Sequence, residues 1–150
     1  MSRIKELQKY VHHDLAGNVK EASAVAHLHG VALAAAILAK KRGEDAEIAT
    51  MAGLLHDLYA YTAGSYDDHA HLGADYARKV LNKLNVASPE ETEMICSAIW
   101  NHSSKDEVNG AIDEILKDAD VLHHTLNDPT KAVKEHEQAR YTALCGELGL

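Results

Sequence analysis

A histidine followed directly by an aspartate, His56-Asp57, lies at the end of an apolar stretch that covers residues 52–58. An imidazole and a carboxylate inside an apolar helix lose their hydration, and a cation that takes both as ligands offsets that loss. A second histidine, His27, lies upstream among apolar residues, and an aspartate, Asp120, lies downstream beside an apolar helix face. The order His, His-Asp, Asp therefore predicts a metal site assembled from several helices.

Three further histidines stand at the ends of predicted helices, where side chains from different helices can converge. His69 and His71 begin a helix, and residues two apart on a helix point about 200° apart, so we expect only one of them to face inwards. His102 ends another helix, directly after Ile99-Trp100 and Asn101. Facing helices commonly assemble such sites, and imidazole and carboxylate ligands without cysteine suit Fe, Mn, Co, Ni or Zn in an open site.

The periodicity of the apolar residues indicates the helices that position these side chains. Apolar residues recur with helical spacing, and the chain has only two prolines and no phenylalanine, so we predict an all-α domain of about six to seven helices. The fourth helix is expected to begin at Asp67 or Asp68, and the seventh at Asp128-Pro129. The expected helices cover residues 4–15, 18–42, 45–58, 68–84, 89–100, 111–125 and 129–146, with loops at 59–66 and 101–110.

Several residues indicate where helices begin and end. Gly43 is expected to close the second helix and Asp45 to cap the third. Ser88 and Glu91 have the spacing of a capping box, with Pro89 in the first turn of the fifth helix. In the fourth helix, one face is expected to carry Leu72, Tyr76, Val80 and Leu84. Asp118, two residues before Asp120, is expected to be a solvated charge.

Length and charge limit the classes of protein. With 150 residues we expect a single domain, 1–150, whose motif-bearing core covers about residues 20–125. The formal charge is 15 − 23 = −8, which argues against a nucleic acid polymer as partner. The start of the chain has charges where an export signal needs apolar residues, and two cysteines favour free thiols, so we expect a cytoplasmic protein. Residues 22–39 are apolar enough for a membrane span, but their histidines and alanines favour a buried core helix.

Three segments together resemble the motifs of the HD superfamily, whose members are largely metal-dependent phosphohydrolases. HLHGVALAAAILA resembles the first motif, AGLLHDL the histidine-aspartate motif and LKDADVL the closing aspartate motif, over residues 27–124. The first motif often has an arginine where this chain has Gly30, which removes a possible phosphate contact. The resemblance implies an HD-type helical domain with His27, His56, Asp57 and Asp120 as metal ligands.

A subset of the superfamily has two more histidines and binds two metal ions. His69, ahead of Gly73-Ala74, resembles one of them, and His102 in AIWNHSS resembles a segment of bacterial HD hydrolases that cleave diadenosine tetraphosphate. The resemblance thus implies a bridging Asp57, with His71 as the alternative to His69. The branch that cleaves cyclic di-GMP is disfavoured because the chain contains no GYP sequence. The complete implied ligand set is His27, His56, Asp57, His69, His102 and Asp120.

The resemblance implies hydrolysis of a phosphate ester or anhydride in a small nucleotide-like molecule, by water activated on one or two divalent metal ions. Asp57 is expected to accept the proton of the attacking water, and Lys105 to contact a substrate phosphate. The loop tyrosines could line a pocket and stack a base or be ordinary loop residues, His123 or His124 could support a ligand, and His136 is expected on the surface. The loop tyrosines are Tyr59, Tyr61 and Tyr66.

Two other functions fit the same pattern. HD-type di-iron oxygenases share the six-ligand set, and a non-catalytic metal-binding or ligand-binding module that regulates a partner would need only part of it. Oxygen uptake separates the first alternative from hydrolysis. The first and last helices are expected to pack on the core or to form a homodimer face.

Overall fold

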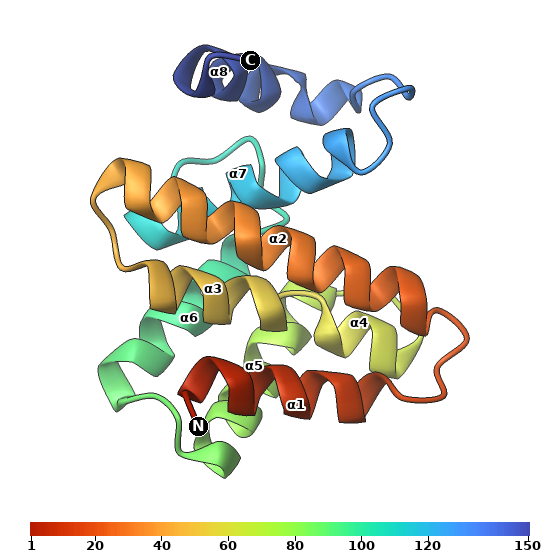
Figure 1. Ribbon diagram of the computed structural model, residues 1–150, viewed down its shortest axis with the longest axis vertical. Coiled ribbons are helices and arrows are strands. Elements are labelled where there is room, and N and C mark those ends of the chain that lie inside the picture. The colour runs from red at the N-terminus through yellow and green to blue at the C-terminus, as the bar shows by residue number, and fades with distance from the viewer.

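Helices account for all the regular structure of the protein, and a computed structural model describes residues 1–150 (Figure 1). The predicted all-α fold is therefore confirmed. The elements are α1 (Arg3–Leu15), α2 (Glu21–Arg42), α3 (Ala46–Leu55), α4 (Leu58–Ala63), α5 (His69–Leu84), α6 (Pro89–Asn101), α7 (Ala111–Leu126), the 3-10 helix η1 (Glu135–Glu137) and α8 (Gln138–Leu148).

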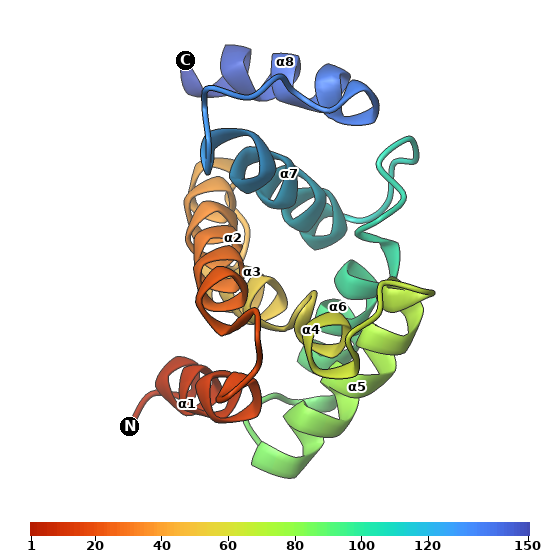
Figure 2. The same ribbon diagram turned by 90° about the vertical axis from the view of Figure 1, so that its right-hand side faces the viewer.

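Helix α2 is the central helix. It packs against α3 and α7, and a view turned by 90° shows α7 and α8 at one end of the molecule and α1 and α5 at the other (Figure 2). By length and composition α2 could cross a membrane, but Leu28, Val31 and Leu38 are fully buried against neighbouring helices. Burial of this apolar surface stabilises the fold, so α2 is the predicted core helix.

The backbones of α2 and α3 approach each other closely at Gly53. A Cβ atom at this position would lie 2.6 Å from the Ala32 Cα atom and 2.8 Å from the Ala32 nitrogen. Only a residue without a side chain fits this contact. The contact brings the end of α3, with His56, against the middle of α2, with His27.

The caps expected from the sequence are present. Gly43 ends α2 with a left-handed backbone, and the Asp45 carboxylate accepts hydrogen bonds from the first backbone N–H groups of α3. Ser88 and Glu91 make both hydrogen bonds of a capping box at α6. Glu91 also accepts a 2.7 Å hydrogen bond from Arg3, which ties α1 to α6.

Two expectations for the middle of the chain were wrong. The third helix ends at Leu55 rather than Leu58, and residues 59–63, expected as part of a loop, belong to α4. In α5, Leu72 is 38 % exposed, and the buried face consists mainly of small residues, including Gly73, Ala74 and Ala77. Small side chains allow α5 to lie close to its neighbours, which the spacing of larger apolar residues did not indicate.

The end of the chain also differs from expectation. Asp128 caps a single turn by accepting hydrogen bonds from Thr130, and regular structure resumes only with η1 and α8. Residues 129–137 have few apolar side chains, so a helix there would have no core-facing stripe. Asp118 is buried rather than solvated, because Arg42 and Arg140 contact its carboxylate at 2.7 and 3.0 Å.

Candidate metal centre

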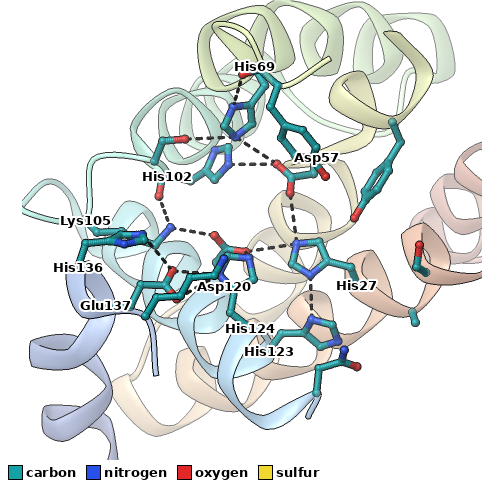
Figure 3. Close-up of a pocket in the computed structure, with 17 residues that line it drawn as sticks. His27, Asp57, His69, His102, Lys105, Asp120, His123, His124, His136 and Glu137 are labelled. Carbon is teal, nitrogen blue, oxygen red and sulfur yellow. Dashed lines mark hydrogen bonds and ion pairs between the residues drawn. The ribbon is translucent and has the colours of Figure 1, made fainter. Parts of the chain in front are cut away.

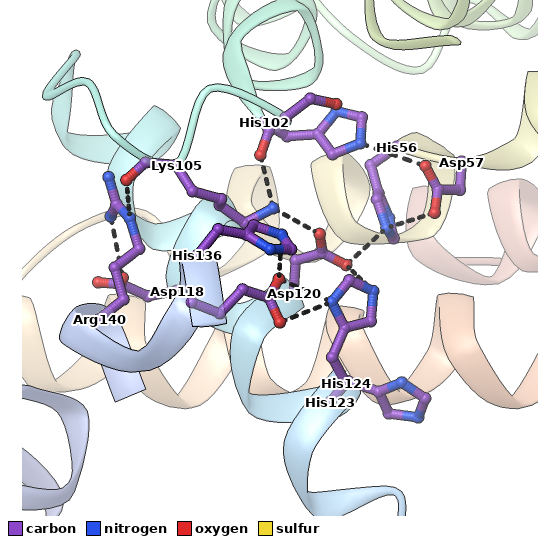
Figure 4. Close-up of polar contacts among 12 residues, drawn as sticks. His56, Asp57, His102, Lys105, Asp118, Asp120, His123, His124, His136 and Arg140 are labelled. Atoms are coloured by element: carbon purple, nitrogen blue, oxygen red, sulfur yellow. Dashed lines mark hydrogen bonds and ion pairs between the residues drawn. The ribbon is translucent and has the colours of Figure 1, made fainter. Parts of the chain in front are cut away.

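Four buried residues from α2, the α3–α4 junction and α7 bring their potential ligand atoms together. The atoms of His27, His56, Asp57 and Asp120 all lie within 4.8 Å of one another (Figures 3 and 4). The Nε2 atom of His27 lies 3.1 Å from Nε2 of His56, 3.2 Å from Oδ2 of Asp57 and 3.3 Å from Oδ1 of Asp120. The structure thus places the four residues of the first predicted group around one point.

A second group adjoins the first and shares Asp57 with it. Oδ1 of Asp57 lies 3.2 Å from Nε2 of His102 and 3.5 Å from Nε2 of His69. Its other oxygen, Oδ2, faces His27 and His56. One carboxylate therefore presents one oxygen to each group, which is the arrangement of a bridging ligand.

Three of the histidines are oriented by backbone carbonyl groups. Nδ1 of His56, His69 and His102 donates to the carbonyl three residues earlier, at 2.7, 2.9 and 2.6 Å. A carbonyl oxygen has two lone pairs, so Tyr66 O and Ile99 O accept the imidazole N–H in addition to a backbone N–H. Each bond fixes the hydrogen on Nδ1 and leaves the Nε2 lone pair facing the site.

His71, the alternative to His69, lies outside the site. Its side chain is 47 % exposed, pairs with Asp68 at 2.9 Å and stacks on Trp100. The left-handed backbone of Asp68 sets the start of α5, and with it which histidine faces Asp57. Of the two, the geometry brings only His69 to the second group.

The two buried carboxylates of the first group favour positive charge beside them. Burial disfavours the charged form of His56, but Asp57 and Asp120 outweigh it and raise the pKa of His56 to about 10. Burial likewise opposes ionisation of Asp57 and Asp120, yet the histidines, together with Lys105 beside Asp120, hold the pKa of both carboxyls well below their usual range. Oδ1 of Asp120 is buried and makes no hydrogen bond. Because buried polar atoms are normally satisfied, this orphaned oxygen and the mixed donor set fit a divalent transition metal ion.

Lys105 lies against this site. Its ammonium group is 7 % exposed and donates to Oδ2 of Asp120 at 2.8 Å and to the His102 carbonyl at 2.7 Å (Figure 4). The loop that carries it is held by the buried ammonium of Lys117, bonded to Glu107 O, and by Arg140, bonded to Lys105 O. An ammonium has three N–H groups, so these two bonds leave one for a ligand.

Sequence reasoning missed Glu137. This glutamate of η1 is 1 % exposed and accepts a 2.9 Å hydrogen bond from Nδ1 of His124, whose Nε2 lies 3.3 Å from Oδ1 of Asp120. Asp120, His124 and Glu137 form a third cluster of potential ligands. No sequence signal marked Glu137, because a glutamate in a polar segment with few apolar residues has the appearance of a solvated residue.

The two ligand groups open into a cavity of about 560 Å³. Tyr61 and Tyr66 line it, as does Lys105, whereas the third loop tyrosine, Tyr59, is not among its lining residues. Lys134 and His136, from the segment around η1, line it as well, and His136 is largely exposed, as expected for a surface residue. The volume suits a small molecule.

Comparisons with known proteins agree with this geometry. The model of the HD domain family matches residues 24–125. Ribonuclease Y from Sulfurimonas denitrificans is 32 % identical over 124 residues, which cover 81 % of this chain and 22 % of that protein. Ribonuclease Y from a Sulfurovum species is 30 % identical over 125 residues, covering 77 % and 23 %. This chain therefore spans less than a quarter of the length of these curated relatives.

One solved structure is similar over nearly the whole chain. It is the crystal structure of a predicted HD superfamily hydrolase from an uncultured Thermotogales bacterium. It is 21 % identical, superposes with a TM-score of 0.68, and the match covers 99 % of this chain and 90 % of the other. At this identity the likeness shows a shared fold, which extends beyond the matched family region to both ends of the chain.

Proposed function

Because this chain belongs to the HD domain family, we propose that it is a metal-dependent phosphohydrolase that cleaves a phosphate ester or anhydride of a small nucleotide-like molecule. The observation that carries this proposal is the position of Asp57. Its two carboxylate oxygens face two separate groups of histidines beside a cavity. A site for two adjacent cations is well suited to the displacement of a phosphoryl group.

The residues divide into two sets around Asp57. His27, His56 and Asp120 would hold one cation with Asp57, and His69 and His102 would hold a second. Fe, Mn, Co, Ni and Zn all accept these ligands. A divalent ion held there would polarise a phosphoryl oxygen and lower the pKa of its bound water towards ~7.

Asp57 and Lys105 are the chain's own candidates for catalysis. Asp57 is placed to bridge the two cation positions, and we propose it as the acceptor of the proton from the attacking water. Lys105 neutralises the buried carboxylate of Asp120 and has one N–H left to contact a phosphate oxygen. Its backbone anchors keep that donor at the edge of the cavity.

The cavity supports a nucleotide-like substrate. The rings of Tyr61 and Tyr66, with centroids 6.3 Å apart, offer aromatic surface to a base. The formal charge of −8 disfavours a long polyanion, and attraction of phosphate would then be local. The relatives are named ribonucleases, and RNA has the same class of bond, so an RNA oligonucleotide belongs among the substrates tested. We further propose a cytoplasmic location, in keeping with two free cysteines.

The first test is the metal content of untagged, gently purified protein, measured by plasma mass spectrometry. His56→Ala removes a fully buried ligand, and His13→Ala, at an exposed position of α1, is the matched control. We expect about two metal ions per chain in the wild type and in His13→Ala, and loss in His56→Ala. One ion per chain would restrict the site to the four-residue group. No metal, even after reconstitution with Mn or Fe, would refute the proposal.

The second test is turnover. Mononucleotides, dinucleoside polyphosphates and a short oligoribonucleotide are incubated with the metal-loaded protein, and phosphate or nucleotide release is measured. We expect hydrolysis by the wild type and none by Asp57→Asn. Full turnover by Asp57→Asn with metal retained would contradict the role of Asp57. Substrate-dependent oxygen uptake without hydrolysis would favour the oxygenase alternative instead.

A further inference from the structure

We infer that His123 is a positioning residue that orients His27 for metal binding, and that Gly30 provides the space in which His123 does so. This inference rests on the proposed metal site. It concerns two residues that are not themselves ligands, one on α7 and one on α2. Both are within one helical turn of a proposed ligand in sequence.

His27 differs from the other histidines of the site in its position on a helix. His56, His69 and His102 lie at or next to helix ends and donate from Nδ1 to the carbonyl group three residues earlier. His27 lies in the interior of α2, where the backbone carbonyl groups accept the hydrogen bonds of the helix itself. Its Nδ1 therefore needs a partner from another element.

That partner is His123. The two Nδ1 atoms are 2.8 Å apart, and the ring centroids are 4.8 Å apart (Figure 3). Nε2 of His27 faces Asp57 and Asp120 and must keep its lone pair free to bind a cation. The hydrogen of His27 then lies on Nδ1, and Nδ1 of His123 accepts it. This bond fixes the tautomer and the ring plane of His27, as outer partners of metal ligands do.

Gly30 makes this arrangement possible. A Cβ atom at position 30 would lie 2.2 Å from Cδ2 and 2.6 Å from Nε2 of His123. The imidazole of His123 thus occupies the space that any side chain on this face of α2 would fill. The space and the hydrogen bond are separate observations that point to the same residue.

The test is the affinity of the metal-free protein for Mn²⁺, measured by calorimetric titration, together with the melting temperature of each variant. We expect His123→Ala to weaken binding by about 10–100-fold, the usual effect of losing the outer partner of a ligand. His123→Asn should keep most of the affinity, because its amide oxygen can accept the bond from His27. His29→Ala is the matched control and should bind as the wild type does, since His29 pairs with His12 instead.

Gly30→Ala separates positioning from general destabilisation. We expect it to weaken Mn²⁺ binding as His123→Ala does, because the new methyl group displaces the His123 ring. The variant that carries both substitutions should bind Mn²⁺ no more weakly than His123→Ala alone, since both substitutions break the same contact between His123 and His27. The melting temperature of the double variant should be no lower than that of His123→Ala, because alanine stabilises a helix interior more than glycine does.

The outcomes distinguish this inference from the proposal on which it rests. A wild-type protein that binds no Mn²⁺, and no other transition metal ion, would overturn both. A wild-type protein that binds Mn²⁺, with His123→Ala or Gly30→Ala binding equally well, would overturn the role of His123 and leave the metal site standing. Equal losses in His123→Asn and His123→Ala would also overturn it, because an accepting side chain would then have no effect.

Discussion

Substitution of Gly53 by alanine should destabilise the protein and move His56 away from His27 within the first ligand group. The added Cβ would lie 2.6 Å from Ala32 Cα, whereas ordinary contacts of this kind are 3.4–4 Å. The obstruction is backbone rather than a flexible side chain, so α3 must move away from α2 by about 1 Å. Because His56 directly follows the last residue of α3 and His27 lies on α2, the movement would lengthen the 3.1 Å distance between their Nε2 atoms.

The expected magnitude follows from two opposing effects. Overpacking of this kind costs about 1–3 kcal/mol, and replacing glycine by alanine in a helix returns about 0.5–1 kcal/mol. Because the obstruction is backbone, the upper part of the overpacking range applies, about 2–3 kcal/mol, and we expect a net loss of about 1–2 kcal/mol in the free energy of unfolding. For a chain of this size that corresponds to a melting temperature lower by about 2–8 °C.

Gly146→Ala provides the matched control. Gly146 is also inside a helix, α8, but a Cβ there would meet nothing within 4 Å. Urea denaturation of both variants should therefore show opposite effects, with Gly146→Ala more stable than the wild type by about 0.5–1 kcal/mol. A Gly53→Ala variant that is as stable as the wild type and binds metal with unchanged affinity would refute the reasoning.

Three further predictions concern pH, metal and the loop anchor. The hydrogen bond from Arg3 and those at Ser88 lower the pKa of Glu91 to about 2, so its contribution is complete above the unfolded pKa and is lost as the pH falls towards 2. Glu91→Gln should cost about 1 kcal/mol at pH 7 and progressively less below about pH 5, with Glu90→Gln as control; a difference that grows on acidification would contradict this. Metal at about 100 times its Kd should add about 2.7 kcal/mol of stability, seen as a higher melting temperature that a chelator reverses, and an unchanged melting temperature would argue against binding to the folded state. Lys117→Met should cost about 1–3 kcal/mol and speed amide hydrogen exchange in residues 103–109, whereas unchanged exchange would show that the loop does not depend on this anchor.

The sequence could point to the four proposed ligands of the first group because each has a locally recognisable setting. His27 and the His56-Asp57 pair are polar residues in apolar helical patterns, where an unsatisfied imidazole or carboxylate is costly. Helix caps were equally recognisable, because Asp45 and Ser88 act on backbone groups two or three residues away. Such features depend on neighbours in the chain, and these expectations agree with the structure.

Features that depend on distant parts of the chain could not be predicted. Whether His69 or His71 faces Asp57 depends on the turn at Asp68 that starts α5. Glu137 is buried because the chain end returns to His124, and nothing in its own segment requires that. The short helix α4 was missed because its tyrosines and the following glycine have the composition of a loop.

All six proposed ligands lie within residues 24–125, the region matched by the HD domain family, whereas the segment that contains η1 lies outside that region. Lys134, His136 and Glu137 nevertheless line the same cavity as those ligands. The proposed ligands and part of the cavity wall are therefore encoded in separate stretches of the chain. Glu137 contacts His124 and Arg140 holds the Lys105 loop, so the terminal stretch also supports the site. Lys134 and His136 are not proposed ligands, so changes at these two positions can alter which molecules the cavity accepts while all six ligands stay in place. Exchanging these two residues between homologues would be a direct route to new substrate preference.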